Sequence, residues 1–79
     1  ADPKGYRAYV PDAVDVAAIR KRTRLTQAAF SKRYGIPIGT LRDLEQKRAQ
    51  PDTSTRAYLT VIGRDPEAIF RLLSQDVAA

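Results

Sequence analysis

The sequence predicts an all-α fold: a compact domain of five short helices preceded by a short extended arm. Two helical patterns lie on either side of Gly35 in the segment from Thr26 to Arg48. Further helical patterns before and after that segment are bounded by capping residues, proline and glycine. With 79 residues the chain has room for one small domain. A second subunit would add to the stability of a domain of this size.

Residues 1–11 form the expected arm, and residues 12–79 form the helical domain. Prolines and a glycine punctuate the first segment, and apolar residues at every second position from Tyr6 to Val10 favour extended backbone. An arm of this length needs a partner strand to join a sheet. It can dock on another protein through Tyr6 and Tyr9, fold onto its own domain, or cross to the second subunit of a dimer.

The first helix is expected to begin after Asp12 or Asp15 and to run to about Arg22. Either aspartate can cap it, because a side-chain carboxylate accepts from the unpaired N–H groups of a first helical turn. Val16 and Ile19 give this helix an apolar edge.

The second helix is expected at about 27–34 and the third at about 38–46. Thr26 can cap the second helix, and Gly35 can enter the left-handed region at its end. Pro37 suits the start of the third helix, where no N–H is needed. The apolar side chains that can share one core are Phe30, Tyr34, Ile36, Leu41 and Leu44. These offsets describe a helix-turn-helix, whose second helix enters the DNA major groove.

A fourth helix is expected to follow the loop and capping residues of 51–54. It is expected to reach about Ile62, where Gly63 ends it. Helical spacing predicts a buried stripe that consists of Ala57, Tyr58, Val61 and Ile62.

A fifth helix is expected at about 66–76. Asp65 can cap it, Pro66 suits its first position, and Glu67 lies near its positive end. Its apolar surface is wider than one buried stripe and includes Ile69, Phe70 and Leu73. This surface either packs within its own subunit or is shared. A small domain has little core to cover it, which favours contact between two subunits of a dimer.

Positive charge is concentrated on the helix-turn-helix motif, about residues 26–46, and its flanks. Nine Lys and Arg residues lie between Arg20 and Arg48, against two acids, so this stretch carries +7 and the rest of the chain −2. Charge alone is compatible with a solvated basic face. Its coincidence with the motif favours a site for nucleic acid.

Several classes of function are not expected. The chain has no cysteine and no histidine, which excludes disulfides and a zinc site with the usual ligands. No metal or cofactor is expected. Enzymatic activity is not expected, because histidine is absent, no nucleophile–base pair is evident, and the four glycines lack the spacing of a phosphate-binding loop. No apolar run reaches the roughly 18 residues of a membrane span, and no signal peptide is evident. A cytoplasmic protein is therefore expected.

From about Val14 to Gln75 the chain resembles the Xre-type, phage-repressor-like helix-turn-helix proteins. The likeness rests on TQAAFSKRYG followed by TLRDLE. More narrowly, VDVAAIRKRTRLTQAAFSKRYGIPIGTLRDLEQKRAQPD followed by RDPEAIF looks like HigA-type antitoxins. Such antitoxins pair with RelE/ParE-like toxins and repress their own operon. Members often carry a further N-terminal segment, which implies that this chain is a fragment or a short variant.

The resemblance also implies which residues contact DNA. Thr26 and Gln27 are expected to touch phosphate at the start of the second helix, and Lys47 and Arg48 to hold phosphates beyond the third. The residues expected to face the major groove are Pro37, Ile38, Gly39, Thr40, Arg42 and Asp43. Ile38 can contact a thymine methyl, Arg42 can bind guanine through a bidentate fork, and Asp43 can accept from cytosine N4.

The same resemblance implies an ion pair and marks three departures from the family pattern. Arg20 of the first helix is expected to pair with Glu45 of the third, and two solvated charges are the alternative. Gly39 stands where relatives often carry a long polar side chain, so one base reader is missing. Lys47 and Arg24 stand where relatives often carry glycine.

The implied function is that of a homodimeric, sequence-specific DNA-binding repressor that is also the antitoxin of a RelE/ParE-like toxin and represses its own operon. The expected partners are double-stranded operator DNA, a second copy of the chain, and the toxin, which Tyr6 and Tyr9 would contact. Two alternatives stay open. One is an Xre-type repressor without a toxin partner, and the other is a toxin-binding module that does not read DNA.

Overall fold

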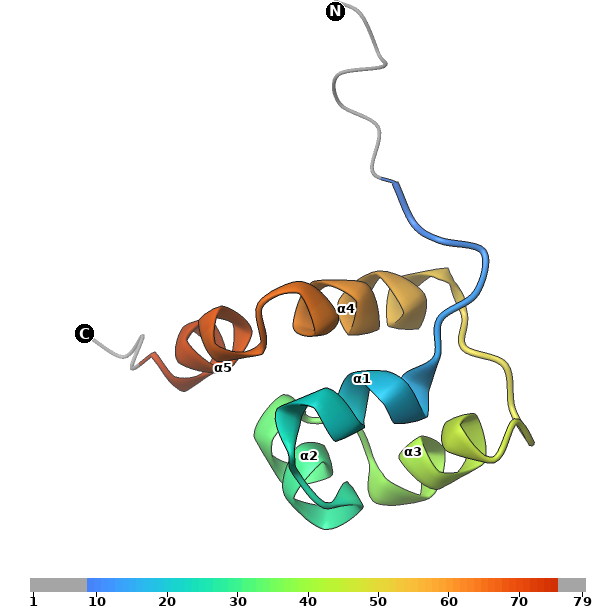
Figure 1. The fold of residues 1–79 in the computed structure, drawn as a ribbon, viewed down its shortest axis with the longest axis horizontal. Helices are drawn as coiled ribbons and strands as arrows, with labels where there is room; N and C mark the ends of the chain where they lie inside the picture. The colour runs from blue at the N-terminus through green and yellow to red at the C-terminus, as the bar shows by residue number, and fades with distance from the viewer. Residues whose placement is uncertain (1–8, 76–79) are drawn as a thin grey trace, which may run out of the picture.

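Five α-helices make up the part of the chain that the structure describes, residues 9–75 of a computed structural model (Figure 1). The helices are α1 (Val16–Thr23), α2 (Gln27–Tyr34), α3 (Ile38–Glu45), α4 (Thr53–Arg64) and α5 (Pro66–Ser74). No strand occurs within residues 9–75. The predicted all-α, five-helix fold is confirmed. Tyr6, like the rest of residues 1–8, lies outside the described residues.

Side-chain caps begin four of the five helices. Each cap accepts a hydrogen bond from the N–H three residues later, at 2.8–3.1 Å, and the caps are Asp15, Thr26, Asp52 and Asp65. Of the two aspartates considered for α1, Asp15 is therefore the cap. α3 differs, because Pro37 precedes it and supplies no side-chain hydrogen bond.

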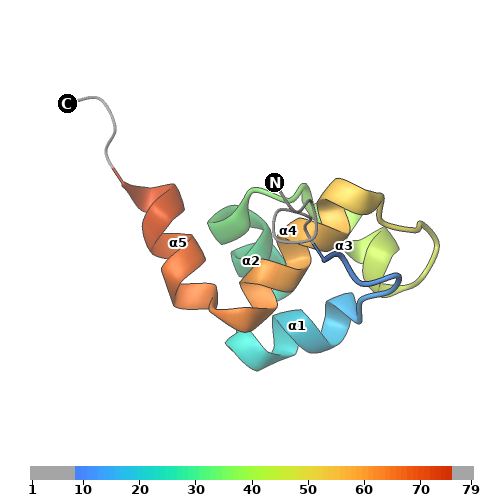
Figure 2. The same cartoon turned by 90° about the horizontal axis from the view of Figure 1, so that it is seen from above.

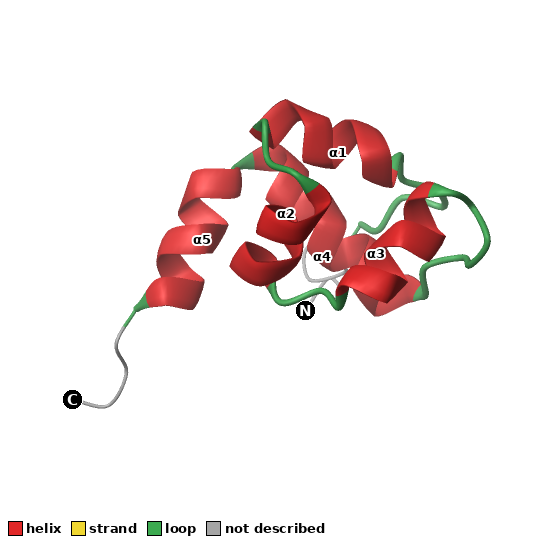
Figure 3. Cartoon of the chain, turned by 90° about the horizontal axis from the view of Figure 1, so that it is seen from below, coloured by secondary structure: helices red, strands yellow, loops and turns green. Residues whose placement is uncertain are grey.

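The helices form two groups around one core. α4 and α5 follow each other along one side of the domain, and α2 and α3 form the opposite side (Figure 1). α1 contacts both α4 and α3, and α5 contacts α2 (Figures 2 and 3). The buried core consists of Val16, Ile19, Phe30, Tyr34, Ile36, Leu41, Leu44, Leu59 and Ile62. Every one of the five residues assigned to a shared core around the turn is thus buried.

Two tyrosine hydroxyls connect α2 to the α4–α5 pair. The Tyr34 hydroxyl donates to the Pro66 carbonyl O at 3.0 Å, and the Tyr58 hydroxyl donates to the Tyr34 carbonyl O at 2.6 Å. The Tyr34 ring also packs on Phe30, with ring centroids 4.8 Å apart. Burial raises the pKa of both Tyr34 and Tyr58, because it disfavours the charged phenolate. Both hydroxyls therefore stay protonated donors at neutral pH.

Gly63 does not end α4, contrary to the prediction. The helix continues to Arg64, and the N–H of Asp65 still donates to the Val61 carbonyl O at 3.1 Å. Pro66 sets the end of the helix instead. A proline disfavours helical backbone in the residue before it, and Asp65 accordingly has φ −153° and ψ 80°.

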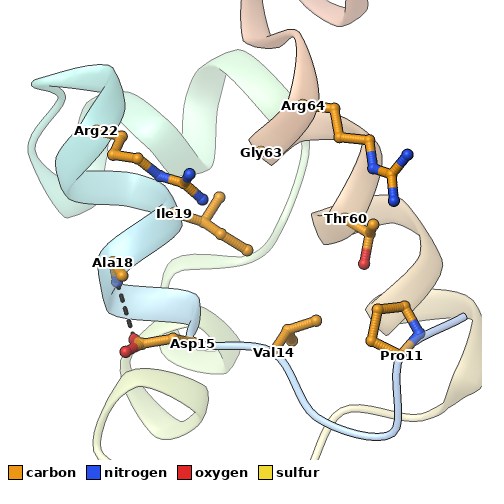
Figure 4. A pocket seen from close by; sticks show the side chains of 9 residues that line it. All are labelled: Pro11, Val14, Asp15, Ala18, Ile19, Arg22, Thr60, Gly63 and Arg64. Carbon is orange, nitrogen blue, oxygen red and sulfur yellow. Dashed lines mark hydrogen bonds between the residues drawn. The ribbon is translucent and has the colours of Figure 1, made fainter.

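Gly63 allows α4 to approach α1 closely. A Cβ atom at Gly63 would lie 3.3 Å from Arg22 Nη2 and 3.4 Å from Ile19 Cγ1. Figure 4 shows the Arg22 side chain reaching toward Gly63 beside an open groove of about 270 Å³. Residues of α1, of α4 and of the segment before α1 line this groove, and none comes from α2 or α3.

The buried face of α4 also differs from the predicted stripe. Leu59 and Ile62 are fully buried, whereas Val61 is 43% exposed. Ala57 and Tyr58 are half-buried. Helical spacing alone leaves the direction of an apolar stripe open by about one residue. Contact with α1 and α5 selects the face that contains Leu59 and Ile62.

The end of the arm nearest to the domain is attached to α4. Arg56 Nε donates to the Pro11 carbonyl O at 2.9 Å. Val10 and Pro11 are half-buried, whereas the Tyr9 side chain points away from the core and is 79% exposed. Residues 9–11 therefore lie on their own domain and leave Tyr9 open to a partner.

Candidate nucleic-acid interface

The turn between α2 and α3 fixes the direction in which α3 leaves the core. Gly35 has φ +75°, and its N–H donates to the Ser31 carbonyl O at 2.9 Å. The Ser31 hydroxyl donates to the Ile36 carbonyl O. Ile36 is buried, so the turn is held by one apolar anchor and two hydrogen bonds. The small Ser31 side chain therefore serves as a hydrogen-bond donor within the turn.

α3 has one buried and one exposed face. Leu41 and Leu44 point into the core. The exposed residues at the start and along the outer face of α3 are Pro37, Gly39, Thr40 and Arg42, and Ile38 and Asp43 are half-buried beside them. All six residues expected to face the major groove are therefore accessible to some degree.

The first turn of α3 leaves backbone donors unpaired by any side-chain cap. The earliest backbone bond of the helix runs from the Leu41 N–H to the Pro37 carbonyl O, at 2.9 Å. The N–H groups of Ile38, Gly39 and Thr40 precede that bond, and the first N–H groups of any helix lack an intrahelical acceptor. The N-terminus of α3 is therefore open to an anion or to solvent.

Thr26 and Gln27, expected to touch phosphate, are already engaged within the protein. The Thr26 hydroxyl accepts from the Ala29 N–H at 3.1 Å. The side-chain amide of Gln27 donates to Glu45 Oε1 at 3.1 Å, which joins the start of α2 to the last residue of α3. That bond uses one of the two amide hydrogens of Gln27, so the other stays available to a ligand.

Arg20 and Glu45 form an ion pair that connects α1 to α3. Arg20 Nε and Nη2 donate to Glu45 Oε2 and Oε1, at 2.5 and 2.9 Å, and Nη1 donates to the Leu25 carbonyl O at 2.9 Å. The two side chains are only 15% and 7% exposed. The Arg20 hydrogen bonds, helped by Gln27, hold the pKa of Glu45 below its ordinary value, and burial opposes them. The same pair raises the pKa of Arg20.

The turn after α3 places Arg48 over Asp43. The Asp43 carbonyl O accepts from the Arg48 N–H at 2.8 Å. Arg48 Nε and Nη2 each lie 3.2 Å from Asp43 Oδ1. The Asp43 side chain, expected to accept from a base, thus holds one of the arginines expected to bind phosphate.

One comparison with solved structures decides the family. A structure described as an HTH XRE-family like protein from Agrobacterium tumefaciens is 51% identical, with a TM-score of 0.73; the match covers 75% of this chain and 95% of that one. The chain belongs to the helix-turn-helix XRE family. No family model matches the chain, and no curated protein matches it.

Two cations of this XRE-family chain occupy left-handed backbone. Arg24, at the end of α1, has φ +64°, and Lys47, after α3, has φ +61°. These are the two positions at which glycine was expected from the resemblance. Left-handed backbone costs a residue with a Cβ atom about 1–2 kcal/mol. The lysine and arginine are therefore present despite a local conformational cost.

Three of the nine cations between residues 20 and 48 have a carboxylate partner within residues 9–75. Arg20 pairs with Glu45, Arg48 with Asp43, and Arg33 with Glu67 at 3.5 Å. The remaining cations of the stretch are Lys21, Arg22, Arg24, Lys32, Arg42 and Lys47. Most of the positive charge on the XRE-family motif and its flanks is therefore not paired with an acidic side chain of residues 9–75.

The residues expected in a dimer contact divide into two groups. Ile69 and Phe70 are half-buried against the core of their own chain, and the Arg33 guanidinium lies 4.1 Å from the centre of the Phe70 ring. Leu72 and Leu73 are 59% and 54% exposed. The outer face of α5 therefore has apolar surface available to another chain, mainly at its C-terminal end.

Arg56 is a structural residue that the sequence does not indicate. Besides the bond to Pro11, its Nη1 donates to the Pro51 carbonyl O at 3.0 Å and its Nη2 to Thr53 Oγ1 at 3.3 Å. One side chain of the XRE-family fold thus fastens both the segment before α1 and the loop after α3. Its main acceptors are backbone carbonyls, which carry no residue-type signal.

Within residues 9–75 no helix has the length and hydrophobicity to cross a membrane. The same residues contain no group of three or more acidic side chains arranged to hold a metal ion.

Proposed function

We propose that this XRE-family chain is a sequence-specific DNA-binding repressor that acts on its own operon and is the antitoxin of a RelE/ParE-like toxin. In the proposed mode, the exposed face of α3 enters the major groove. Phosphates are held at the start of α2 by Thr26 and Gln27, and beyond α3 by Lys47 and Arg48. Two copies bind two half-sites about one helical turn apart, near 34 Å.

One observation carries the DNA-binding proposal: the outer face of α3 and its first N–H groups are exposed among cations. Most of these cations have no acidic partner within residues 9–75. An accessible helix start attracts a phosphate through its unpaired N–H groups and its dipole. Exposed Arg42, one turn further on, has the length and planar fork needed to bind guanine O6 and N7.

The test is binding to DNA from the region upstream of the gene for this chain. Each phosphate contact releases counterions, so the affinity should fall steeply as salt rises from about 50 to 200 mM. Footprinting with Arg42→Ala separates two roles of this residue. Specificity lost at one base pair supports base reading, and uniform weakening on all sequences means that Arg42 contacts backbone only. A nearly flat response to salt would contradict the proposed mode.

A different observation supports the antitoxin part of the proposal. Tyr9 is 79% exposed and lines an apolar groove of about 310 Å³ together with Val10 and Val61. The sequence predicts residues 1–11 to be an extended arm, and an extended segment can add a strand to the edge of a partner sheet. Tyr6, the other predicted contact, belongs to the residues outside the described range.

Removal of residues 1–10 tests this contact. The affinity for a purified toxin encoded beside this gene should be lost, while operator binding should persist. Tyr9→Ala should weaken toxin binding with little effect on stability, because the side chain is exposed. Unchanged toxin affinity in both variants contradicts the proposed contact, and the lack of a toxin gene beside this one favours a repressor without a toxin partner.

A further inference from the structure

The C-terminal turn of α3 holds two opposite charges against each other at the edge of the proposed DNA interface. Lys47 is left-handed, which turns the chain back toward the helix. The Asp43 carbonyl O then accepts from the N–H groups of Arg48 and Ala49, at 2.8 and 3.3 Å. The backbone of this turn therefore sets Arg48 beside Asp43, independently of their side chains.

The side-chain contact is direct but open to water. Arg48 Nε and Nη2 both approach Asp43 Oδ1 at 3.2 Å, and the side chains of Arg48 and Asp43 are 63% and 48% exposed. An exposed pair of this kind is weak. A DNA phosphate can therefore take Arg48 away from Asp43 at little cost.

Asp43 is the one carboxylate of α3 that faces solvent. The other acid of the helix, Glu45, is 7% exposed and receives hydrogen bonds from Arg20 and Gln27. When Arg48 moves to a phosphate, the Asp43 carboxylate is left without its cation beside a negatively charged backbone. This repulsion acts on every DNA sequence alike unless a base supplies a donor, and the amino group of cytosine in the major groove is such a donor.

We propose that Asp43 sets the selectivity of DNA binding by holding Arg48 in an exchangeable ion pair. This inference rests on the proposed function and deepens it. Asp43 lowers the affinity for DNA in general, and only a site that offers a base-edge donor to the released carboxylate recovers the loss. Selectivity then comes from a repulsive group as well as from attractive contacts.

Asp43→Asn in the full chain tests the proposal, because it removes the charge and keeps the size. The probes are a duplex from the region upstream of the gene and a scrambled duplex of the same composition. The variant should bind the scrambled duplex roughly twofold to fivefold more tightly than the wild type. The ratio of operator to scrambled affinity should fall.

Glu67→Gln is the matched control, since it removes an exposed carboxylate that also pairs with an arginine, but on α5. It should leave both affinities and their ratio unchanged. An equal rise in the two variants means that only net charge matters and overturns the proposal. Thermal unfolding of each variant verifies that it is folded.

Arg48→Gln completes the test as a double-mutant cycle. With Arg48 removed, no ion pair has to be broken and only the repulsion by the Asp43 carboxylate remains, so Asp43→Asn should raise the affinity for scrambled DNA by less than it does in the wild type. The same gain in both backgrounds shows direct repulsion without the ion pair. A loss of operator affinity at one base pair, with scrambled binding unchanged, makes Asp43 a simple base reader. Either result overturns the proposal while DNA binding itself stands, whereas a wild type that binds neither duplex overturns both.

Discussion

At the scale of single residues, Glu45 connects three helices near the proposed interface. It accepts from Arg20 on α1 and Gln27 on α2, while it belongs to α3. Loss of the carboxylate leaves the charge of Arg20, whose side chain is 15% exposed, without its partner, and Gln27 loses the same acceptor. Removing one member of a buried pair costs more than the pair contributes, because the remaining charge is desolvated and uncompensated.

Glu45→Ala should therefore lower the free energy of unfolding by about 3 kcal/mol. Asp43→Ala, in an exposed pair on the same helix, should lower it by less than about 1 kcal/mol. Chemical denaturation of the two variants measures the difference directly. Equal losses of unfolding free energy in the two variants would mean that the Arg20–Glu45 contact stabilises the fold no more than the Arg48–Asp43 contact does.

Acid should remove the same contribution in the wild type. Glu45 has a depressed pKa in the folded state, mainly because Arg20 donates to it, so it stabilises the fold above the ordinary pKa of 4.5. The contribution is lost as the pH falls below that value and through the lower folded pKa. The difference in unfolding free energy between wild type and Glu45→Gln should shrink between pH 6 and pH 3, in a series of denaturation curves. A constant difference would contradict this linkage.

At the scale of helices, the ends of α1 and α3 share an unusual feature. Arg24 and Lys47 both take left-handed backbone, a conformation that glycine adopts without steric cost. Neither cation has a carboxylate partner within residues 9–75. A charge kept at a conformational cost, next to α2 and α3, fits selection for binding rather than for stability.

Lys47→Gly should raise the free energy of unfolding by about 0.5–1 kcal/mol, since relief of the left-handed strain exceeds the entropy that glycine adds to the unfolded chain. The same variant should weaken DNA binding and reduce its salt dependence by about one phosphate contact. Denaturation and salt-dependent titration measure the two effects. Lys47→Ala is the control, which should weaken DNA binding without gaining stability. A stability loss in the glycine variant would refute the strain argument.

Substitutions of Gly63 distinguish the effect of helix propensity on stability from the effect of packing between α4 and α1. Gly63→Ala should stabilise the chain by up to about 1 kcal/mol, because the helix gains propensity and the nearest contact, Arg22 Nη2, is the flexible end of a side chain. Gly63→Leu should destabilise it, since a larger side chain meets Ile19 of α1. Thermal unfolding of both variants checks the order. Destabilisation by alanine would mean that Arg22 cannot move aside.

Local chemistry explains which parts of the fold could be predicted from the sequence. The bounds of α2 and the caps Thr26 and Asp65 follow from contacts within a few residues. The sequence predicts the end of α4 too early, at Gly63. Two local signals, Gly63 and Pro66, compete there, and only Pro66 prevents the helix from continuing. The pairing of Arg20 and Glu45 came from family resemblance, since no local rule relates residues 25 positions apart.

The remaining features depend on tertiary contact. The contacts of Arg56 with the Pro11 and Pro51 carbonyl groups involve atoms that every residue has, so the sequence offers no sign of them. The sequence predicts a base contact for Asp43, whereas in the structure its side chain pairs with Arg48. This pairing depends on the left-handed turn at Lys47. The DNA, dimer and toxin contacts assigned from the sequence stay predictions.

At the scale of the whole molecule, α5 contributes two of the four large apolar side chains that are exposed within residues 9–75. Its inner side is fixed to α2 by the Arg33 contact with Phe70 and by the Tyr34 bond to Pro66. Its outer side exposes Leu72 and Leu73. Contact between two α5 helices would bury this surface and is the dimer geometry that we expect.

Leu73→Glu should shift the chain toward monomers without unfolding it, because the side chain is 54% exposed in one subunit. Sedimentation at several protein concentrations measures the shift. Gln50→Glu, an exposed position in the loop after α3, adds the same charge as a control and should not change the association. A wild type that is monomeric at all concentrations would contradict the α5 dimer.

The bond from Tyr34 to Pro66 has a consequence for operator architecture. If the two α5 helices join the subunits, this bond helps to hold each helix-turn-helix at a fixed angle to the twofold axis. The spacing of the half-sites that the dimer can bind would then be fixed as well. Tyr34→Phe removes this hydrogen bond and should let the dimer tolerate a wider range of half-site spacings. Operators lengthened by one base pair would then lose less affinity in the variant than in the wild type.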